Sequence, residues 1–139
     1  MVRIDVTYRG DLRCEAVHGL SGQAIVTDAP VDNQGKGEAF SPTDLVAAAL
    51  GTCIATIMGI AAQKAGIDLR GLGITVEKEM TSEGPRRIGR LSVRVAMPCD
   101  LEDGVRQKFE AIADLCPVRK SLSPDIETSV SFTYPSGCR

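Results

Sequence analysis

The sequence contains no tryptophan, only 4% aromatic residues and a single histidine, and these shortages exclude several classes of function. Proteins that bind single-stranded nucleic acid stack bases on aromatic side chains, and nucleic-acid binders in general carry a basic surface. In this chain 16 lysines and arginines are outnumbered by 18 aspartates and glutamates, which gives a formal net charge of −2. We therefore expect no nucleic-acid partner.

Paired metal ligands are also absent from the sequence. None of the five cysteines forms a Cys-x-x-Cys pair, and His18 has no second histidine to join it. Because structural zinc sites use closely spaced cysteines and histidines, we expect no metal and no cofactor. The odd cysteine count, the wide spacing and the lack of a signal-peptide pattern favour a reducing compartment, so we expect a cytoplasmic protein.

What the chain does have is the composition of a folded protein. Its 139 residues include 43% hydrophobic and 24% charged residues, which is typical of a globular chain. That length suits one domain with its own core, and we expect a single domain over residues 1–139. No internal repeat or low-complexity segment interrupts it.

Apolar and polar residues alternate in the first two strands expected near the N-terminus, and a short apolar run gives the third, which predicts a three-stranded meander. In the first strand three apolar side chains share one face and predict a half-buried strand: Ile4, Val6 and Tyr8. The other two strands are expected at 12–16 and 24–27. A loop rich in Asp, Gly and Pro follows over 28–40.

A long uncharged helix is predicted from Ser41 to about Ala62. Ser41 is a capping residue, Pro42 suits the first helical position and Asp44 favours the positive end of the helix. The length raises the possibility of a membrane span, but Ala, Gly and Thr dominate the run and no basic or aromatic residues flank it, so we expect no membrane partner. A helix that is apolar on all sides needs cover on several sides, which predicts a homodimer.

The second half of the chain predicts two strands, a helix and a last strand. Alternation over 72–76 and 91–97 predicts a hairpin, and alternation over 126–134 predicts the final strand. A helical period over 101–116 places Cys116 on the inward face of that helix. The order β-β-β-α-β-β-α-β is α+β, with mostly antiparallel sheets packed against helices.

The cysteines differ in their settings. Cys14 is expected in the core, Cys99 and Cys138 are expected at the surface, and His18 has a structural role near a turn. Two others carry a chemical context. Cys53 lies in the apolar helix, whereas Cys116 precedes Pro117 and a turn whose backbone N–H groups and nearby Arg119 and Lys120 lower a thiol pKa. Burial raises it instead, so a redox dithiol and a pair of core cysteines both remain open.

Two segments carry a family resemblance: SPTDLVAAALGTC (41–53) and LCPVRKSL (115–122). With the element order, they resemble the OsmC/Ohr family of osmotically inducible and organic-hydroperoxide-resistance proteins over nearly the whole chain. The resemblance implies an intertwined homodimer and a thiol peroxidase. Cys53 would attack an organic hydroperoxide and become a sulfenic acid, Cys116 would condense with it to a disulfide, and a dithiol would reduce that disulfide.

The resemblance also implies an arginine and a carboxylate in the site. Arg13 matches the arginine of the N-terminal hairpin, with Arg9 as the alternative. The glutamate that follows the proline in the Ohr branch is replaced here by Thr43. Asp44 comes one residue later, about 100° further around the helix. Asp44 is therefore a candidate site carboxylate, or an acid that only stabilises the helix start, and the chain fits a less characterised branch.

A second hypothesis differs in class. Because one fold supports more than one function, the chain is alternatively a non-enzymatic dimer that binds an apolar small molecule, with structural cysteines. Thiol reactivity separates the two hypotheses, since only the peroxidase needs an ionised sulfur.

Overall fold

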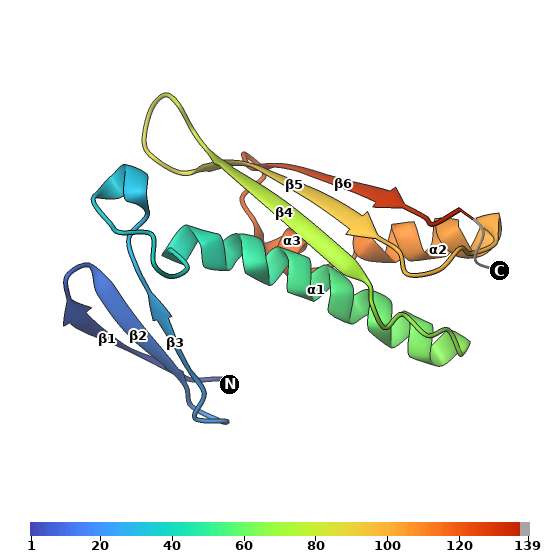
Figure 1. Cartoon of the computed structure of the whole chain (residues 1–139), viewed down its shortest axis with the longest axis horizontal. Helices are drawn as coiled ribbons and strands as arrows, with labels where there is room; N and C mark the ends of the chain where they lie inside the picture. Colours follow the sequence, from blue (N-terminus) through green and yellow to red (C-terminus); the bar gives the residue numbers. More distant parts are fainter. Residues whose placement is uncertain (137–139) are drawn as a thin grey trace. The chain divides into compact units, whose positions relative to one another are not determined.

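The computed structural model describes residues 1–136 and divides the chain into two compact units (Figure 1). The first unit is Met1–Val46, and the second is Ala47–Arg139. Cys138, expected at the surface, lies outside the described residues. The elements follow the predicted α+β order, with one additional short helix before the last strand.

The first unit contains the predicted meander. Strands β1 (Ile4–Gly10), β2 (Arg13–His18) and β3 (Ala24–Thr27) form an antiparallel sheet in the order β1-β2-β3. The short 3-10 helix η1 (Val31–Asn33) lies in the loop that follows. His18 has the structural role expected of it, because its Nδ1 accepts the backbone N–H of Ser21 at 3.3 Å in the turn before β3.

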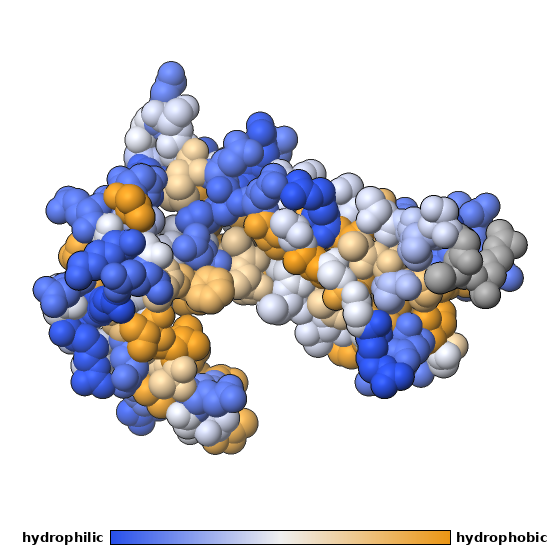
Figure 2. All heavy atoms as spheres, in the orientation of Figure 1, coloured by the Kyte–Doolittle hydropathy of each residue, from blue (hydrophilic) through white to orange (hydrophobic). Residues whose placement is uncertain are grey.

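The outer strand of this sheet is not half-buried, as its alternation predicts. Its three apolar side chains are 62%, 64% and 64% exposed: Ile4, Val6 and Tyr8. The unit holds three strands, η1 and only the start of a helix, so it has no element that covers the face. Figure 2 shows hydrophobic residues gathered at the surface over these strands. Exposed apolar residues in such a group are typical of a surface that a partner covers.

Helix α1 (Pro42–Ala65) begins and ends where the sequence predicts. Its first turn is a capping box: the Ser41 hydroxyl accepts the Asp44 N–H at 3.1 Å, and the Asp44 carboxylate accepts the Ser41 N–H at 2.8 Å. Pro42 occupies the first helical position, where no N–H is needed. Gly66 follows the helix with a φ of +69°, the left-handed conformation that commonly ends a helix.

The second unit packs α1 against a three-stranded sheet. Strands β4 (Gly73–Met80), β5 (Ile88–Ala96) and β6 (Glu127–Thr133) pair in the order β4-β5-β6, antiparallel in the first pair and parallel in the second. Gly51 of α1 lies against β4, where a Cβ at that position would be 3.0 Å from Cγ2 of Val76. The core between them is apolar: Leu50, Ile54, Met58, Leu91, Val93 and Val95.

Within the described residues, α1 is the one helix long and apolar enough to cross a membrane. It is instead the core helix of a soluble fold, since one side of it packs on the sheet. Only 33% of its most apolar 18-residue stretch is buried in the single chain. The remaining surface agrees with the prediction that the helix needs further cover.

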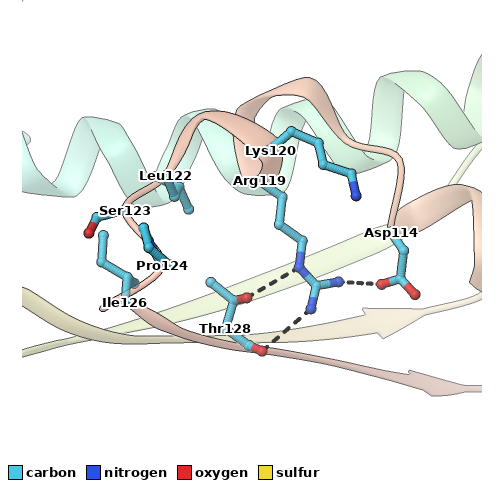
Figure 3. Close-up of a pocket in the computed structure, with 8 residues that line it drawn as sticks. All are labelled: Asp114, Arg119, Lys120, Leu122, Ser123, Pro124, Ile126 and Thr128. Atoms are coloured by element: carbon cyan, nitrogen blue, oxygen red, sulfur yellow. Dashed lines mark hydrogen bonds and ion pairs between the residues drawn. The ribbon is translucent and has the colours of Figure 1, made fainter.

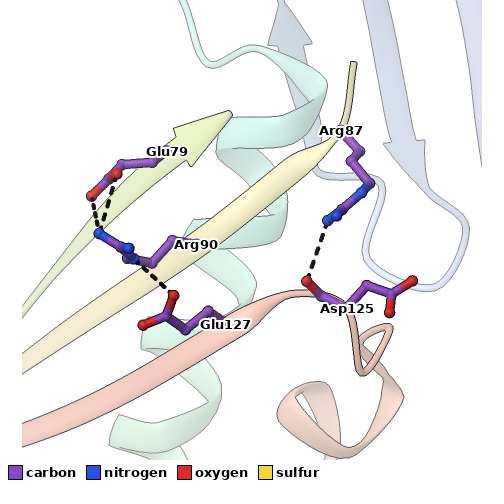
Figure 4. A network of polar contacts seen from close by, with 5 residues as sticks. All are labelled: Glu79, Arg87, Arg90, Asp125 and Glu127. Carbon is purple, nitrogen blue, oxygen red and sulfur yellow. Dashed lines mark hydrogen bonds and ion pairs between the residues drawn. The ribbon is translucent and has the colours of Figure 1, made fainter. Parts of the chain in front are cut away.

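On its other face the sheet carries polar side chains that join the strands. Arg90 on β5 contacts Glu79 on β4 at 3.5 Å and Glu127 on β6 at 3.2 Å, and Arg87 donates to the backbone oxygen of Asp125 (Figure 4). These exposed ion pairs contribute little to the free energy of unfolding, about 0–1 kcal/mol each.

The predicted helix over 101–116 is shorter in the structure. It is α2 (Asp103–Ala113), a separate short helix α3 (Pro117–Ser121) follows it, and Cys116 lies between the two and not on the face of α2. Proline disfavours a helical conformation in the residue before it, and Cys116 accordingly has an extended ψ of 119°. The expected burial is nevertheless observed, because Cys116 is 0% exposed.

Candidate active site

Cys116 caps the short helix α3 from within the core of the second unit. Its Sγ accepts the backbone N–H of Arg119 at 3.5 Å, an N-cap contact that satisfies one otherwise unpaired donor of the helix. The backbone N–H of Val118 also interacts with this sulfur. These are the N–H groups that the sequence predicts in the turn after Cys116 and Pro117.

Cys53, half-buried near the middle of α1, interacts with Cys116. Burial raises the pKa of Cys116, and a hydrogen bond with the Cys53 thiol and the charge of Cys53 raise it further. The two backbone N–H groups lower it by less. A raised pKa favours the protonated thiol form of Cys116.

Contrary to the expectation from the sequence, the positive side chains after Pro117 do not lower the pKa of Cys116. The guanidinium of Arg119 is bonded to Asp114 and Thr128, and only its backbone N–H serves Cys116. Burial therefore outweighs positive charge at Cys116.

Arg13 lies in a cluster of charges in the first unit. Its guanidinium forms ion pairs with Glu38 and with Asp28, the second at 3.5 Å. Arg9, the alternative arginine, pairs at 2.6 Å with Glu15 on the neighbouring strand and is more exposed. Of the two, Arg13 is the arginine held by more than one carboxylate.

Asp28 is a feature that the sequence analysis missed. It directly follows β3, is 1% exposed and accepts the backbone N–H of Glu38 at 3.1 Å. That hydrogen bond is the main reason that its pKa is lowered, and the charge of Arg13 lowers it further. The available signal was an acid immediately after an apolar strand, but the loop composition of 28–40 concealed it.

Asp44 is engaged at the helix start, where its carboxylate accepts the Ser41 N–H. Asp28 and Glu38 form ion pairs with Arg13. Cys14, expected in the core, and Cys99, expected at the surface, are both half-buried, and neither forms a disulfide. No group of three or more potential metal ligands occurs within residues 1–136.

The fold and the thiol pair define a class: an α+β domain in which a half-buried cysteine of a long apolar helix interacts with a buried cysteine of a Cys-Pro turn. A family model described as OsmC-like protein matches residues 35–131. The chain belongs to this OsmC-like family. No curated protein matches the sequence.

Solved structures agree with the family. A protein from Psychrobacter arcticus, proposed as an osmotic stress induced and detoxification response protein, is 46% identical, with 96% of each chain covered and a TM-score of 0.90. More distant structures share the fold alone. They include the organic hydroperoxide resistance protein OsmC of Legionella pneumophila (17% identity, 96% of each chain, TM-score 0.75) and OhrB of Bacillus subtilis (15% identity, 96% and 98%, TM-score 0.71).

Proposed function

We propose that the protein is a thiol peroxidase that reduces organic hydroperoxides. The observation that carries the proposal is the interaction of Cys53 with the buried Cys116 in an OsmC-like fold. Relatives of that fold are named organic hydroperoxide resistance proteins. Two interacting thiols suit a reaction in which one sulfur is oxidised and the second forms a disulfide with it.

In the first step the Cys53 thiolate attacks the terminal oxygen of a hydroperoxide. The O–O bond breaks, the sulfur becomes a sulfenic acid, and the alkoxide takes up a proton to leave as an alcohol. Cys53 is assigned the attack because Cys116 keeps its proton: burial and its neighbour raise the pKa of Cys116. Only a thiolate is nucleophilic enough for this step.

In the second step Cys116 closes the disulfide. Its sulfur attacks the sulfenic sulfur of Cys53, an S–S bond forms, and the hydroxyl leaves with the Cys116 proton as water. A dithiol reductant then transfers two electrons by thiol–disulfide exchange and is itself oxidised to a disulfide. The backbone N–H groups at Cys116 hold its sulfur in place for the attack.

Arg13 is proposed as the cation of the site, which stabilises the thiolate and polarises the peroxide. Asp28 and Glu38 are proposed to orient it, in place of the glutamate that Thr43 replaces. Asp44 then serves the helix start, where its carboxylate completes the capping box. No step of the reaction needs a metal or a cofactor.

The functional form is proposed to be a cytoplasmic homodimer. The exposed apolar face of β1 and the uncovered side of α1 both favour a second subunit, and covering them leaves apolar surroundings suited to an alkyl peroxide. Size-exclusion chromatography with light scattering is expected to give twice the 14.8 kDa chain mass.

Stopped-flow measurement of cumene hydroperoxide consumption by the reduced protein tests the proposal. The wild type is expected to consume one equivalent rapidly, and Cys53→Ser none. Cys116→Ser is expected to react once and then accumulate the sulfenic acid. Cys14→Ser is the matched control, since Cys14 is a half-buried cysteine of the first unit and is expected to leave the rate unchanged.

Two outcomes contradict the proposal. Consumption by Cys53→Ser at the wild-type rate removes Cys53 from the chemistry, and no consumption by the wild type favours the non-enzymatic binding protein. In that second case iodoacetamide at pH 6 is expected to modify Cys53 no faster than a model thiol.

A further inference from the structure

A pocket of about 450 Å³ opens beside α3, between that helix and the start of β6 (Figure 3). Its volume falls within the range of small-molecule sites, about 300–1,000 Å³. The lining residues all come from one stretch of the second unit: Asp114, Arg119, Lys120, Leu122, Ser123, Pro124, Ile126 and Thr128.

Charged groups gather at one end of this pocket. Arg119 bonds to Asp114 through Nη1 and to Thr128 through Nε, at 3.2 Å from the hydroxyl, and through Nη2, at 3.5 Å from the carbonyl oxygen. A guanidinium has five N–H donors in a planar fork. These bonds use three of them, so two donors and a fixed orientation remain for a ligand.

Lys120 adds an unbalanced positive charge at the same end. Its side chain forms no hydrogen bond or ion pair with any residue in the described part of the chain. Asp114 balances Arg119, so the pocket retains one net positive charge, which belongs to Lys120. In Figure 3 the Lys120 amine points toward the side of the pocket on which Arg119 meets Asp114.

The other end of the pocket is apolar. Leu122, Pro124 and Ile126 form it, and Ser123 adds one hydroxyl (Figure 3). Leu122 and Ile126 are only half-buried, so their side chains keep surface that a ligand can cover. A site with a cationic end and an apolar end selects a molecule with an anionic head and a short hydrocarbon body.

We propose that this pocket binds a small amphipathic carboxylate. The carboxylate lies between the Lys120 ammonium and the two remaining N–H donors of Arg119, which suit its two oxygens. The hydrocarbon chain lies on Leu122, Pro124 and Ile126. A neutral alcohol has no negative charge to pair with Lys120 and Arg119, and the positive charge of an amine is repelled by them.

The site goes beyond the proposed peroxidase and does not depend on it. It adjoins the thiol pair, since Arg119 donates its backbone N–H to Cys116 and its guanidinium to the pocket. A bound carboxylate therefore contacts the residue that holds the Cys116 sulfur. Binding is expected equally in Cys53→Ser, which separates a failure of this site from a failure of the peroxidase.

Titration of the reduced full-length protein with sodium hexanoate, followed by two-dimensional ¹H–¹⁵N NMR, tests the proposal. We expect saturable shifts of the Arg119, Lys120 and Ser123 amides with a dissociation constant of about 1 mM, a usual range for so small a ligand. Lys120→Gln is expected to weaken binding about tenfold, the typical loss of one charged hydrogen bond. Lys108→Gln removes an exposed lysine of α2 outside the pocket and is the matched control.

Hexanol and hexylamine at the same concentrations are expected to give no saturable shifts at these amides. The proposal is overturned if hexanoate fails to bind, if Lys120→Gln binds it as well as Lys108→Gln does, or if hexanol binds equally well. Lys120 is exposed, so its substitution is not expected to disturb folding.

Discussion

Helix α1 approaches β4 closely at Gly51, and one neighbouring methyl group decides whether Gly51→Ala raises or lowers the free energy of unfolding. A Cβ at this position would be 3.0 Å from Cγ2 of Val76 and 3.5 Å from Cγ2 of Ile74. The distance to Ile74 is an ordinary van der Waals contact, whereas the distance to Val76 is so short that the Val76 side chain would have to move. Gly51→Ala gains about 0.8–1.0 kcal/mol of helix propensity. Overpacking costs typically about 1–3 kcal/mol.

The single substitution is therefore expected to lower the free energy of unfolding by about 0–2 kcal/mol. Val76→Ala removes the methyl group that the new Cβ meets. In that background Gly51→Ala is expected to stabilise by about 0.8–1.0 kcal/mol, so the double-mutant cycle gives a coupling of about 1–3 kcal/mol. Urea unfolding of the four proteins, followed by circular dichroism at one protein concentration, measures it.

The result that refutes this reasoning is additivity. If Gly51→Ala changes the free energy of unfolding equally, within about 0.3–0.5 kcal/mol, in both backgrounds, Val76 does not limit the approach. The helix would then lie further from the sheet than the structure places it. Because Cys53 follows Gly51 by two residues, the position of its sulfur would change as well.

Three further predictions concern titratable groups. The pKa of Asp28 is lowered in the folded protein, so its charge contributes stability above pH 3.8, its ordinary pKa. This contribution is lost as the pH falls through the pKa of Asp28 in the folded protein. The urea midpoints of the wild type and Asp28→Asn are therefore expected to converge below that pH. Burial and a hydrogen bond to Glu110 raise the pKa of Tyr134 to about 12, which ultraviolet titration measures, and Glu110→Gln is expected to lower it. The stability that Tyr134 contributes is present below pH 10 and is lost as the pH rises through 12. Cys116 is buried with a raised pKa, so iodoacetamide is expected to modify it more slowly than Cys53 in the native protein and at the rate of an ordinary thiol in urea.

Each of these titration predictions has an outcome that contradicts it. A constant difference between Asp28→Asn and the wild type down to pH 2 excludes the charged contacts as the cause. An unchanged Tyr134 pKa in Glu110→Gln leaves burial as the only cause. Faster native alkylation of Cys116 than of Cys53 reverses the proposed roles of the two sulfurs.

Local chemistry made much of the fold predictable from the sequence. Alternating apolar and polar residues predict five of the strands. The capping residues Ser41 to Asp44 predict the start of α1, and Gly66 predicts its end. Each of these signals depends only on residues that are close together in the sequence. The end of α2 at Ala113 is also determined by nearby residues, but the apolar residues keep a helical period up to Cys116 and so predict a longer helix. A proline allows the residue before it to face the core in an extended conformation.

What the sequence did not predict depends on contacts between distant residues. Asp28 is buried because a backbone N–H ten residues later and Arg13 fifteen residues earlier converge on it, and neither contact leaves a periodic pattern. The exposure of Ile4, Val6 and Tyr8 could not be predicted either, since alternation shows that a face is apolar but not which molecule covers it.

The central claim is that Cys53 and Cys116 form one redox pair, and trapping their disulfide tests it most directly. Reduced protein is treated with one equivalent of cumene hydroperoxide, alkylated under denaturing conditions and digested for mass spectrometry. We expect a peptide pair joined through Cys53 and Cys116, with Cys14, Cys99 and Cys138 alkylated. Oxidation that leaves both thiols alkylated, or that joins either of them to another cysteine in preference, contradicts it.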